Sequence, residues 1–192
     1  MELSKRNIGF AITGSFCTVA ECVGQMAALA GLGANVFPIV SEIVYKTDTR
    51  FGNANDLLAH IEKLTGNKVI HSITAAEPIG PKSMLDALII APCTGNTLSK
   101  LSNGVNDTSV TMAAKANLRN LKPVIIAVST NDGLSASAKN IGHLLNVKNI
   151  FFVPFSQDDA VRKENSLIAD MTLVIPTLEA ALTGKQLQPV LA

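Results

Sequence analysis

The sequence has no tryptophan and one tyrosine, and only 16% of its 192 residues are charged. Proteins that bind single-stranded nucleic acid by stacking bases need exposed aromatic rings, so the shortage of these rings argues against that class. The net charge is +1, and no cluster of lysine and arginine offers a basic surface for nucleic acid. Hydrophobic residues make up 47% of the chain, a proportion that favours burial of further surface in a homo-oligomer.

Cysteine and histidine are also scarce, with three of each: Cys17, Cys22, Cys93, His60, His71 and His143. The cysteines form no C-x-x-C pair and have no histidine at ligand spacing, so the sequence predicts no metal site. An odd number of cysteines suits a reducing compartment. No apolar run approaches the roughly 18–20 residues of a membrane span, and no basic-then-apolar leader is seen at the start. Together these absences predict a cytoplasmic protein.

Residues 85–103 carry the strongest structural signal in the chain. A continuous apolar run at 87–91 stops at Pro92, and small polar residues follow at 93–97. An apolar run without alternation is typical of a strand buried on both faces, as in a parallel sheet covered by helices. The polar residues would then lie at the carboxyl end of that strand, where open α/β sheets bind their ligands.

The remaining patterns predict strands and helices in alternation along the chain. Strands are expected at 7–13, 35–40, 87–91, 123–128 and 149–153, with weaker candidates at 69–72 and 171–175. Helices are expected at 16–32, 56–65, 95–102, 107–118, 136–145 and 177–183, with a helical turn at 166–169. Residues 41–55 and 73–83 are expected to be irregular, because they are polar or contain proline and glycine.

This alternation predicts an α/β protein, with one domain over residues 1–192. The expected architecture is a single doubly wound, mostly parallel sheet of about six strands with helices on both faces, Rossmann-like or flavodoxin-like.

Three polar loops should converge at the carboxyl edge of this sheet: residues 13–15, 93–97 and 129–133. They are rich in hydroxyl, amide and backbone N–H groups and poor in charge, which suits a phosphate and a neutral polar ligand body. The first loop lacks the G-x-G-x-x-G pattern, and the chain has no G-x-x-x-x-G-K-[ST] sequence. A mononucleotide therefore fits better than a dinucleotide or a nucleoside triphosphate.

The candidate cofactor ligands in these loops are Gly14, Ser15, Thr94, Asn96, Thr97 and Asn131. Each has a plainer alternative role. Ser15 would also suit a helix N-cap, as would Thr94, Asn96 or Thr97, and Gly14 and Asn131 would suit turns. Lys82 and Lys100 are either solvated lysines or contacts for a substrate carboxylate. Cys93 and His71 are expected to be structural, and no catalytic acid or base can be assigned.

The pattern of these loops resembles the flavoprotein family of flavin-dependent cysteine decarboxylases and their relatives. The resemblance is carried by residues 13–15, by Ala-Pro-x-x-x-Asn-Thr at 91–97, and by Lys-x-x-x-Gly at 100–104. It implies bound FMN, with the phosphate near Ser15 and the 94–97 loop. It also implies a trimer-based homo-oligomer with the flavin near a subunit interface.

Residues 8–17, 77–82, 91–97 and 106–107 resemble one branch of that family, the small subunits of two-component synthases from spore-forming bacteria. This resemblance implies oxidation of a dihydropyridine dicarboxylate in the mother cell. It further implies a larger partner subunit, whose own nucleotide-binding domain contributes NADP.

Two segments depart from the decarboxylase pattern. The catalytic His-Ile of those enzymes is replaced by Ile79-Gly80-Pro81, which argues against decarboxylation. Their Pro-x-Met-Asn-x-x-Met segment, which bears on flavin binding, keeps only Asn131 within residues 129–134. Two alternatives therefore stay open. One is a stand-alone FMN enzyme of the decarboxylase or prenyltransferase kind, and the other is a scaffold subunit whose flavin site has decayed.

Overall fold

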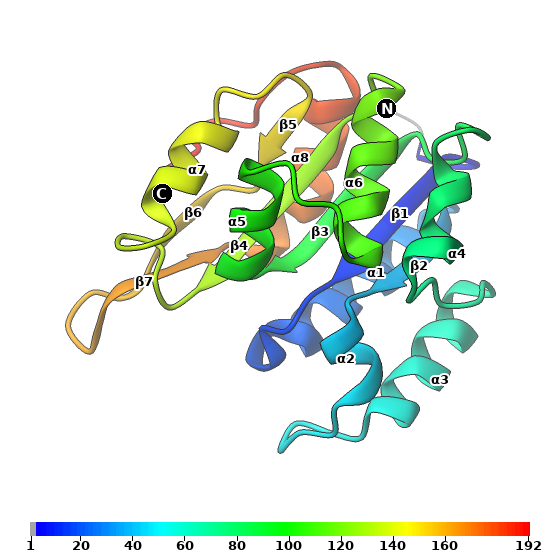
Figure 1. The fold of residues 1–192 in the computed structure, drawn as a ribbon, viewed down its shortest axis with the longest axis horizontal. Helices are drawn as coiled ribbons and strands as arrows, with labels where there is room; N and C mark the ends of the chain where they lie inside the picture. The colour runs from blue at the N-terminus through cyan, green and yellow to red at the C-terminus, as the bar shows by residue number, and fades with distance from the viewer. Residues whose placement is uncertain (1–2) are drawn as a thin grey trace.

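The computed structural model describes residues 3–192, in which a central sheet is covered by helices on both faces (Figure 1). Five strands are parallel and lie in the order β2-β1-β3-β4-β5. Their bounds are β1 (Asn7–Ile12), β2 (Asn35–Val40), β3 (Ala87–Cys93), β4 (Val124–Thr130) and β5 (Ile150–Phe152). The predicted α/β fold with a mostly parallel sheet is confirmed.

The helices form two layers. One layer contains α1 (Val19–Gly31) and α8 (Val174–Leu182), with α3 (Ala54–Thr65) packed against α1. The other contains α4 (Ile73–Ala76), α5 (Gly95–Ser102), α6 (Ser109–Arg119) and α7 (Ala138–Leu144). Figure 1 shows α5 and α6 in front of the sheet and α8 behind it. No helix within residues 3–192 has both the length and the apolar character to cross a membrane.

The largest difference from the sequence prediction is an antiparallel hairpin of β6 (Phe155–Asp159) and β7 (Lys163–Ala169). Its base continues the sheet, because Ile168 and Leu167 pair with the last two residues of β4. The helical turn predicted at 166–169 is therefore wrong. Residues 157–164 are exposed or half-buried and, apart from Ala160 and Val161, polar, so they carry no apolar alternation that would predict a strand.

The weak strand predicted at 171–175 is also wrong. This segment forms the short helix η3 (Met171–Leu173) and the start of α8, preceded by Asp170, whose carboxylate accepts a bond from Thr172 N at 2.9 Å. Met171, Val174 and Leu178 are buried at helical spacing. The short apolar run alone did not distinguish a strand from a buried helical start.

Both segments predicted to be irregular contain helical turns. Residues 41–55 include α2 (Glu42–Lys46), and residues 73–83 include α4 and η2 (Glu77–Ile79). Ser72 caps α4 by accepting a bond from Ala75 N at 3.2 Å, and proline is tolerated in the first turn of η2. The strand expected at 69–72 is reduced to one parallel bridge between Ile39 and Ile70.

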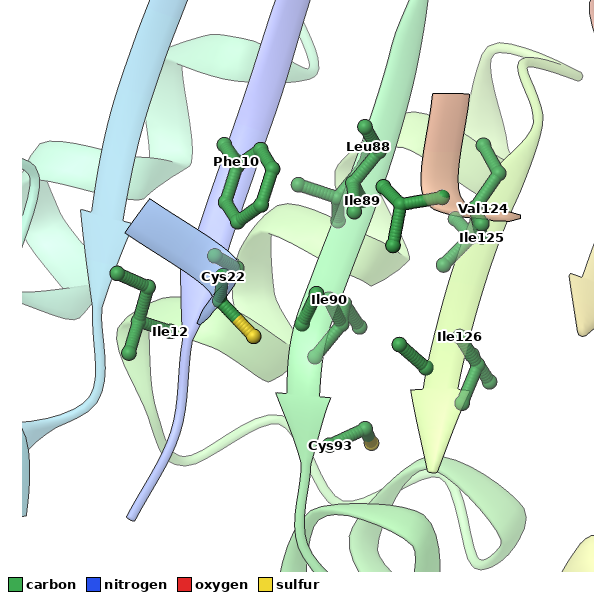
Figure 2. Close-up of a cluster of buried hydrophobic side chains, with 14 of the residues drawn as sticks. Phe10, Ile12, Cys22, Leu88, Ile89, Ile90, Cys93, Val124, Ile125 and Ile126 are labelled. Carbon is green, nitrogen blue, oxygen red and sulfur yellow. The ribbon is translucent and has the colours of Figure 1, made fainter. Parts of the chain in front are cut away.

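All seven residues of β3 are buried, and this strand forms the centre of the hydrophobic core. Figure 2 shows Ile89 and Ile90 between side chains of β1 and β4, with Phe10 on one side and Ile126 on the other. The continuous apolar pattern of the strand is thus explained by helices on both of its faces.

Replacing Ile89 by alanine removes three carbons from a fully buried site and leaves a cavity. We expect the free energy of unfolding to fall by about 2–5 kcal/mol, measured by urea denaturation. Ile43→Ala is the matched control, because Ile43 is 53% exposed and should cost less than about 1 kcal/mol. Equal losses in the two variants would contradict the central position of β3.

Candidate functional site

The first two polar loops are joined by hydrogen bonds at the carboxyl edge of the sheet. Thr13 Oγ1 donates to the carbonyl oxygen of Pro92 at 2.7 Å and accepts a bond from Thr94 N at 3.1 Å. Thr13 is buried, so its hydroxyl acts as an internal connector between β1 and β3 rather than as a ligand group. The contact fixes the start of α5 relative to Gly14.

The third loop reaches the first through two serines. Ser15 Oγ and Ser129 Oγ lie 2.7 Å apart, and Thr18 Oγ1 lies 3.4 Å from Ser129 Oγ. Ser15 is partly exposed, whereas Ser129 is buried. The predicted convergence of the three loops is thus present in the structure, and Ser15 offers a hydroxyl held in place by Ser129.

Ser41 completes this crevice, although the sequence interpretation did not include it. Its backbone N donates to the carbonyl oxygen of Ile12 at 3.0 Å, which places it beside the first loop. Within residues 3–192, Ser41 Oγ is the one buried side-chain oxygen or nitrogen atom that has no hydrogen-bond partner. Buried polar atoms are nearly always hydrogen-bonded, so this hydroxyl is a candidate contact for a ligand or an ordered water. Its position directly after the buried end of β2 was the available signal.

Gly14 lies in the first loop, close to the beginning of α2. A β-carbon at this position would lie 3.0 Å from Cγ2 of Ile43, in the first turn of α2. The absence of a side chain therefore lets backbone groups of the first loop approach whatever the crevice holds.

Asp132 is a second residue that the sequence interpretation missed. Its Oδ1 accepts bonds from Thr130 Oγ1 at 2.5 Å and from Ser137 Oγ at 2.9 Å, so the carboxylate ties β4 to the start of α7. The same oxygen lies beside Gly95 at the N-terminus of α5. A negative charge there is favourable because it faces the positive end of the helix dipole.

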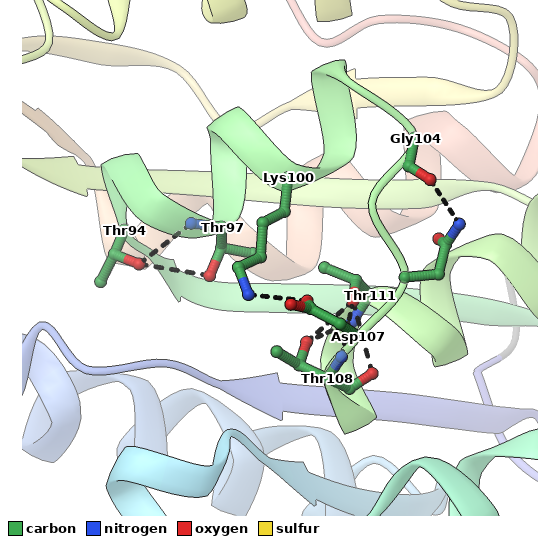
Figure 3. A network of polar contacts seen from close by, with 8 residues as sticks. Thr94, Thr97, Lys100, Gly104, Asp107, Thr108 and Thr111 are labelled. Carbon is green, nitrogen blue, oxygen red and sulfur yellow. Dashed lines mark hydrogen bonds and ion pairs between the residues drawn. The ribbon is translucent and has the colours of Figure 1, made fainter.

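Thr94 and Thr97 lie at the beginning of α5 and bond to each other. Thr97 N donates to Thr94 Oγ1 at 3.4 Å, and the two hydroxyls are 3.2 Å apart (Figure 3). Thr94 is thus the N-cap of α5, the plainer of its two predicted roles. Asn96 is exposed, and Asn131 is exposed beside residues 161–166 of the hairpin.

The two lysines predicted as substrate contacts lie in different places. Lys100 Nζ forms an ion pair with Asp107 Oδ1 at 2.6 Å, and this contact holds the pKa of the Asp107 carboxyl below its ordinary value (Figure 3). Lys82 is exposed in the turn before β3, next to Gly80, whose carbonyl oxygen accepts a bond from Asn120 at the end of α6. That turn lies at the amino edge of the sheet, so the position of Lys82 does not support a contact at this crevice.

The buried thiols are structural. Burial raises the pKa of both Cys22 and Cys93, which keeps each one protonated and unreactive near neutral pH. Cys17 is exposed, and its sulfur lies 3.8 Å from Ser15 Oγ. In the described part of the chain, no three His, Cys, Asp or Glu side chains are grouped as metal ligands would be.

This chain is similar in sequence and in structure to known proteins. The sequence profile described as Flavoprotein matches residues 1–175. The chain belongs to the Flavoprotein family. The B subunit of dipicolinate synthase from Bacillus subtilis is 48% identical over 190 residues, which cover 99% of this chain and 95% of that protein. The flavin prenyltransferase UbiX of Chlamydia muridarum is 32% identical over 107 residues, covering 54% of this chain and 56% of that one.

Two solved structures support the same assignment. The B subunit of dipicolinate synthase from Bacillus halodurans superposes with a TM-score of 0.92, at 46% identity, over 100% of this chain and 98% of that chain. The FMN-dependent cysteine decarboxylase SpaF superposes with a TM-score of 0.65, at 22% identity, over 94% and 97% of the two chains. The second likeness shows a shared fold.

Three polar side chains lie close to Gly95, and their proximity can be tested by measuring the stability of a variant with a side chain at this position. A β-carbon there would lie 2.6–2.7 Å from Asp132 Oδ1, Ser137 Oγ and Thr130 Oγ1, so Gly95→Ala should cost about 1–3 kcal/mol of unfolding free energy. Gly142→Ala in α7 meets no atom within 4 Å and should stabilise by roughly 0.5–1 kcal/mol. Urea denaturation of both variants measures the difference. A stable Gly95→Ala variant would mean that the three polar groups do not close around this glycine.

Proposed function

We propose that this chain is the B subunit of a dipicolinate synthase, which acts with an A subunit to oxidise dihydrodipicolinate to dipicolinate during sporulation. The observation that carries this proposal is similarity over whole chains to proteins of that name, at 48% identity in sequence and a TM-score of 0.92 in structure. The oxidation is driven by aromatisation of the ring, so the enzyme must orient the ring and supply a hydride acceptor.

The proposal includes FMN in the crevice at the carboxyl edge. Ser15 and Ser41 would hold the phosphate, with Gly14 allowing its approach and Thr94 at the border of the site. The unpartnered buried hydroxyl of Ser41 is the structural observation that favours a bound group here. When bound, a flavin supplies a ring that can accept a hydride. Asn96, Thr97 and Asn131, the other predicted ligands, stay predictions, and no contact within the described residues favours them.

NADP is proposed to enter through the A subunit. The first loop of this chain lacks a dinucleotide fingerprint, so a nicotinamide cofactor needs a binding domain elsewhere. We also propose a homo-oligomer, a trimer or a multiple of it. The apolar composition and several large exposed apolar side chains, such as Phe51 and Leu121, favour that assembly.

The alternatives predict different chemistry. A stand-alone decarboxylase would need a proton-transfer group at residues 79–81, where Ile79 is buried and the next two residues are Gly80 and Pro81. A scaffold subunit with a decayed flavin site would bind no flavin and would only complete the site of its partner. Flavin titration and turnover assays separate these alternatives from the synthase proposal.

Ser15→Asp would place a negative charge where the phosphate is proposed to bind. Repulsion should weaken FMN binding at least tenfold, or ~1.4 kcal/mol, as measured by titration of flavin fluorescence. Ser83→Asp, at the amino edge of the sheet, is the matched control and should bind FMN as the wild type does. Unchanged affinity in Ser15→Asp would show that the phosphate site lies elsewhere.

The synthase proposal is tested by turnover with NADP and dihydrodipicolinate. We expect little or no activity from this chain alone, because its first loop lacks a dinucleotide fingerprint, and full activity from the mixture with the A subunit. Formation of dipicolinate is followed by its ultraviolet absorbance. Full activity from this chain alone would contradict the two-component reaction, and full activity from the A subunit alone would reduce this chain to an accessory.

A further inference from the structure

His71 lies at the same edge of the sheet as the crevice, beside Ser41. Ile70 pairs with β2, since its N donates to the carbonyl oxygen of Pro38 and its carbonyl oxygen accepts a bond from Val40 N, each at 2.9 Å. The next residue along, His71, therefore emerges next to the end of β2, where Ser41 follows. The sequence did not predict that His71 lies beside Ser41, because the two residues are far apart along the chain.

The imidazole of His71 is held in a fixed plane. It stacks on the ring of Tyr45 in α2, with centroids 3.7 Å apart and planes 10° from parallel. Tyr45 is tied to the crevice, because its backbone N donates to the carbonyl oxygen of Ser41 at 3.0 Å. Among the residues that the structure describes, no side-chain or backbone group bonds to either imidazole nitrogen. The ring is thus oriented and its nitrogens are available.

His71 and Tyr45 help to line a cavity of about 400 Å³. Four hydroxyl-bearing residues also line it, from the start of α4 and from the segment that leads into α6: Ser72, Thr74, Thr108 and Ser109. Ser109 Oγ donates to the carbonyl oxygen of Val40 at 2.6 Å, so this wall is fixed to the end of β2. The cavity has room for a substituted six-membered ring next to the proposed flavin site.

The charged groups around the imidazole are already paired. Three carboxylates line this cavity or its neighbour, and each contacts a lysine: Glu42 with Lys46 at 2.6 Å, Glu62 with Lys68 at 2.7 Å and Asp107 with Lys100 at 2.6 Å. These lysines hold the pKa of all three carboxyls below the ordinary value, which makes them weaker bases. The Tyr45 phenol is the other titratable group beside the imidazole, because its ring stacks on that of His71. Among the described side chains that line this cavity, the imidazole is left as the base without a cationic partner.

We propose that His71 is the proton acceptor of the oxidation, an inference that rests on the synthase function proposed above. One ring hydrogen of the dihydropyridine would leave with its electron pair as hydride to the oxidised nicotinamide ring of NADP, which is the oxidant of the reaction. A second ring hydrogen leaves as a proton to an imidazole nitrogen of His71, and its bonding electrons complete the aromatic ring. The imidazolium then releases the proton to water, so atoms and charge balance without a further reactant.

The test is steady-state turnover of the complex of both subunits with NADP. His71→Gln should lower kcat about 100-fold or more, because a general base contributes on that scale. In the wild-type complex kcat should fall in acidic solution, since a protonated imidazole cannot accept a proton. The variant should lack that dependence. Its urea transition and its FMN affinity, measured separately, should match those of the wild type.

Two further variants distinguish a chemical role from a structural one. His71→Ala should recover activity on addition of free imidazole, which a packing role would not allow. His143→Gln is the control, because His143 lies on α7 and contacts Ser102 at 2.9 Å, and this variant should keep wild-type turnover and pH dependence. A His71→Gln complex with more than half of wild-type kcat and an unchanged pH profile would overturn the inference but leave the synthase function intact. A wild-type complex without turnover would overturn both.

Discussion

Burial of β3 on both faces is the constraint on which the rest of the structure depends. Every residue of Ala87–Cys93 is buried, between β1 and β4 in the sheet and between helices above and below. It pairs in parallel with both neighbours, and parallel strands end at the same edge of a sheet. The crevice exists because three such strands end together and each continues into small polar residues. Thr13 and Ser129 then join the loops that the sheet has brought together.

The chemistry of that edge is divided into two parts. Ser15 and Ser41 offer neutral hydroxyl and backbone groups, and the Asp132 carboxylate lies at the beginning of α5. The carboxylates that line the two neighbouring cavities are each paired with a lysine. Such pairing at exposed positions adds little stability, but it keeps the local charge balanced. Among the described residues around those cavities, the imidazole of His71 is consequently left without a charged partner.

Much of the fold could be predicted because its elements have regular apolar patterns. The strands of the parallel sheet and helix α1 bury their apolar side chains in patterns typical of strands and of helices. The local sequence therefore indicates both the type of each element and its position in the chain. The hairpin of β6 and β7 could not be predicted in this way. Its outer residues are polar, and its base is a strand because β4 supplies hydrogen bonds to Leu167 and Ile168. Helix α4 depends on a cap by Ser72 that is difficult to recognise among the prolines that follow.

The sequence by itself determined the fold class, the family and the three loops that form the crevice, because buried strands followed by small polar residues are local features. Only the tertiary structure decided which side chains act together. Ser41 follows β2 and lies beside the first loop, where its backbone N donates to the carbonyl oxygen of Ile12. His71 lies at the same edge of the sheet because the preceding residue, Ile70, forms a bridge with Ile39. Lys82 lies at the opposite edge. These positions depend on strand order and on contacts between distant segments. Neither is expressed in the spacing of residues along the chain.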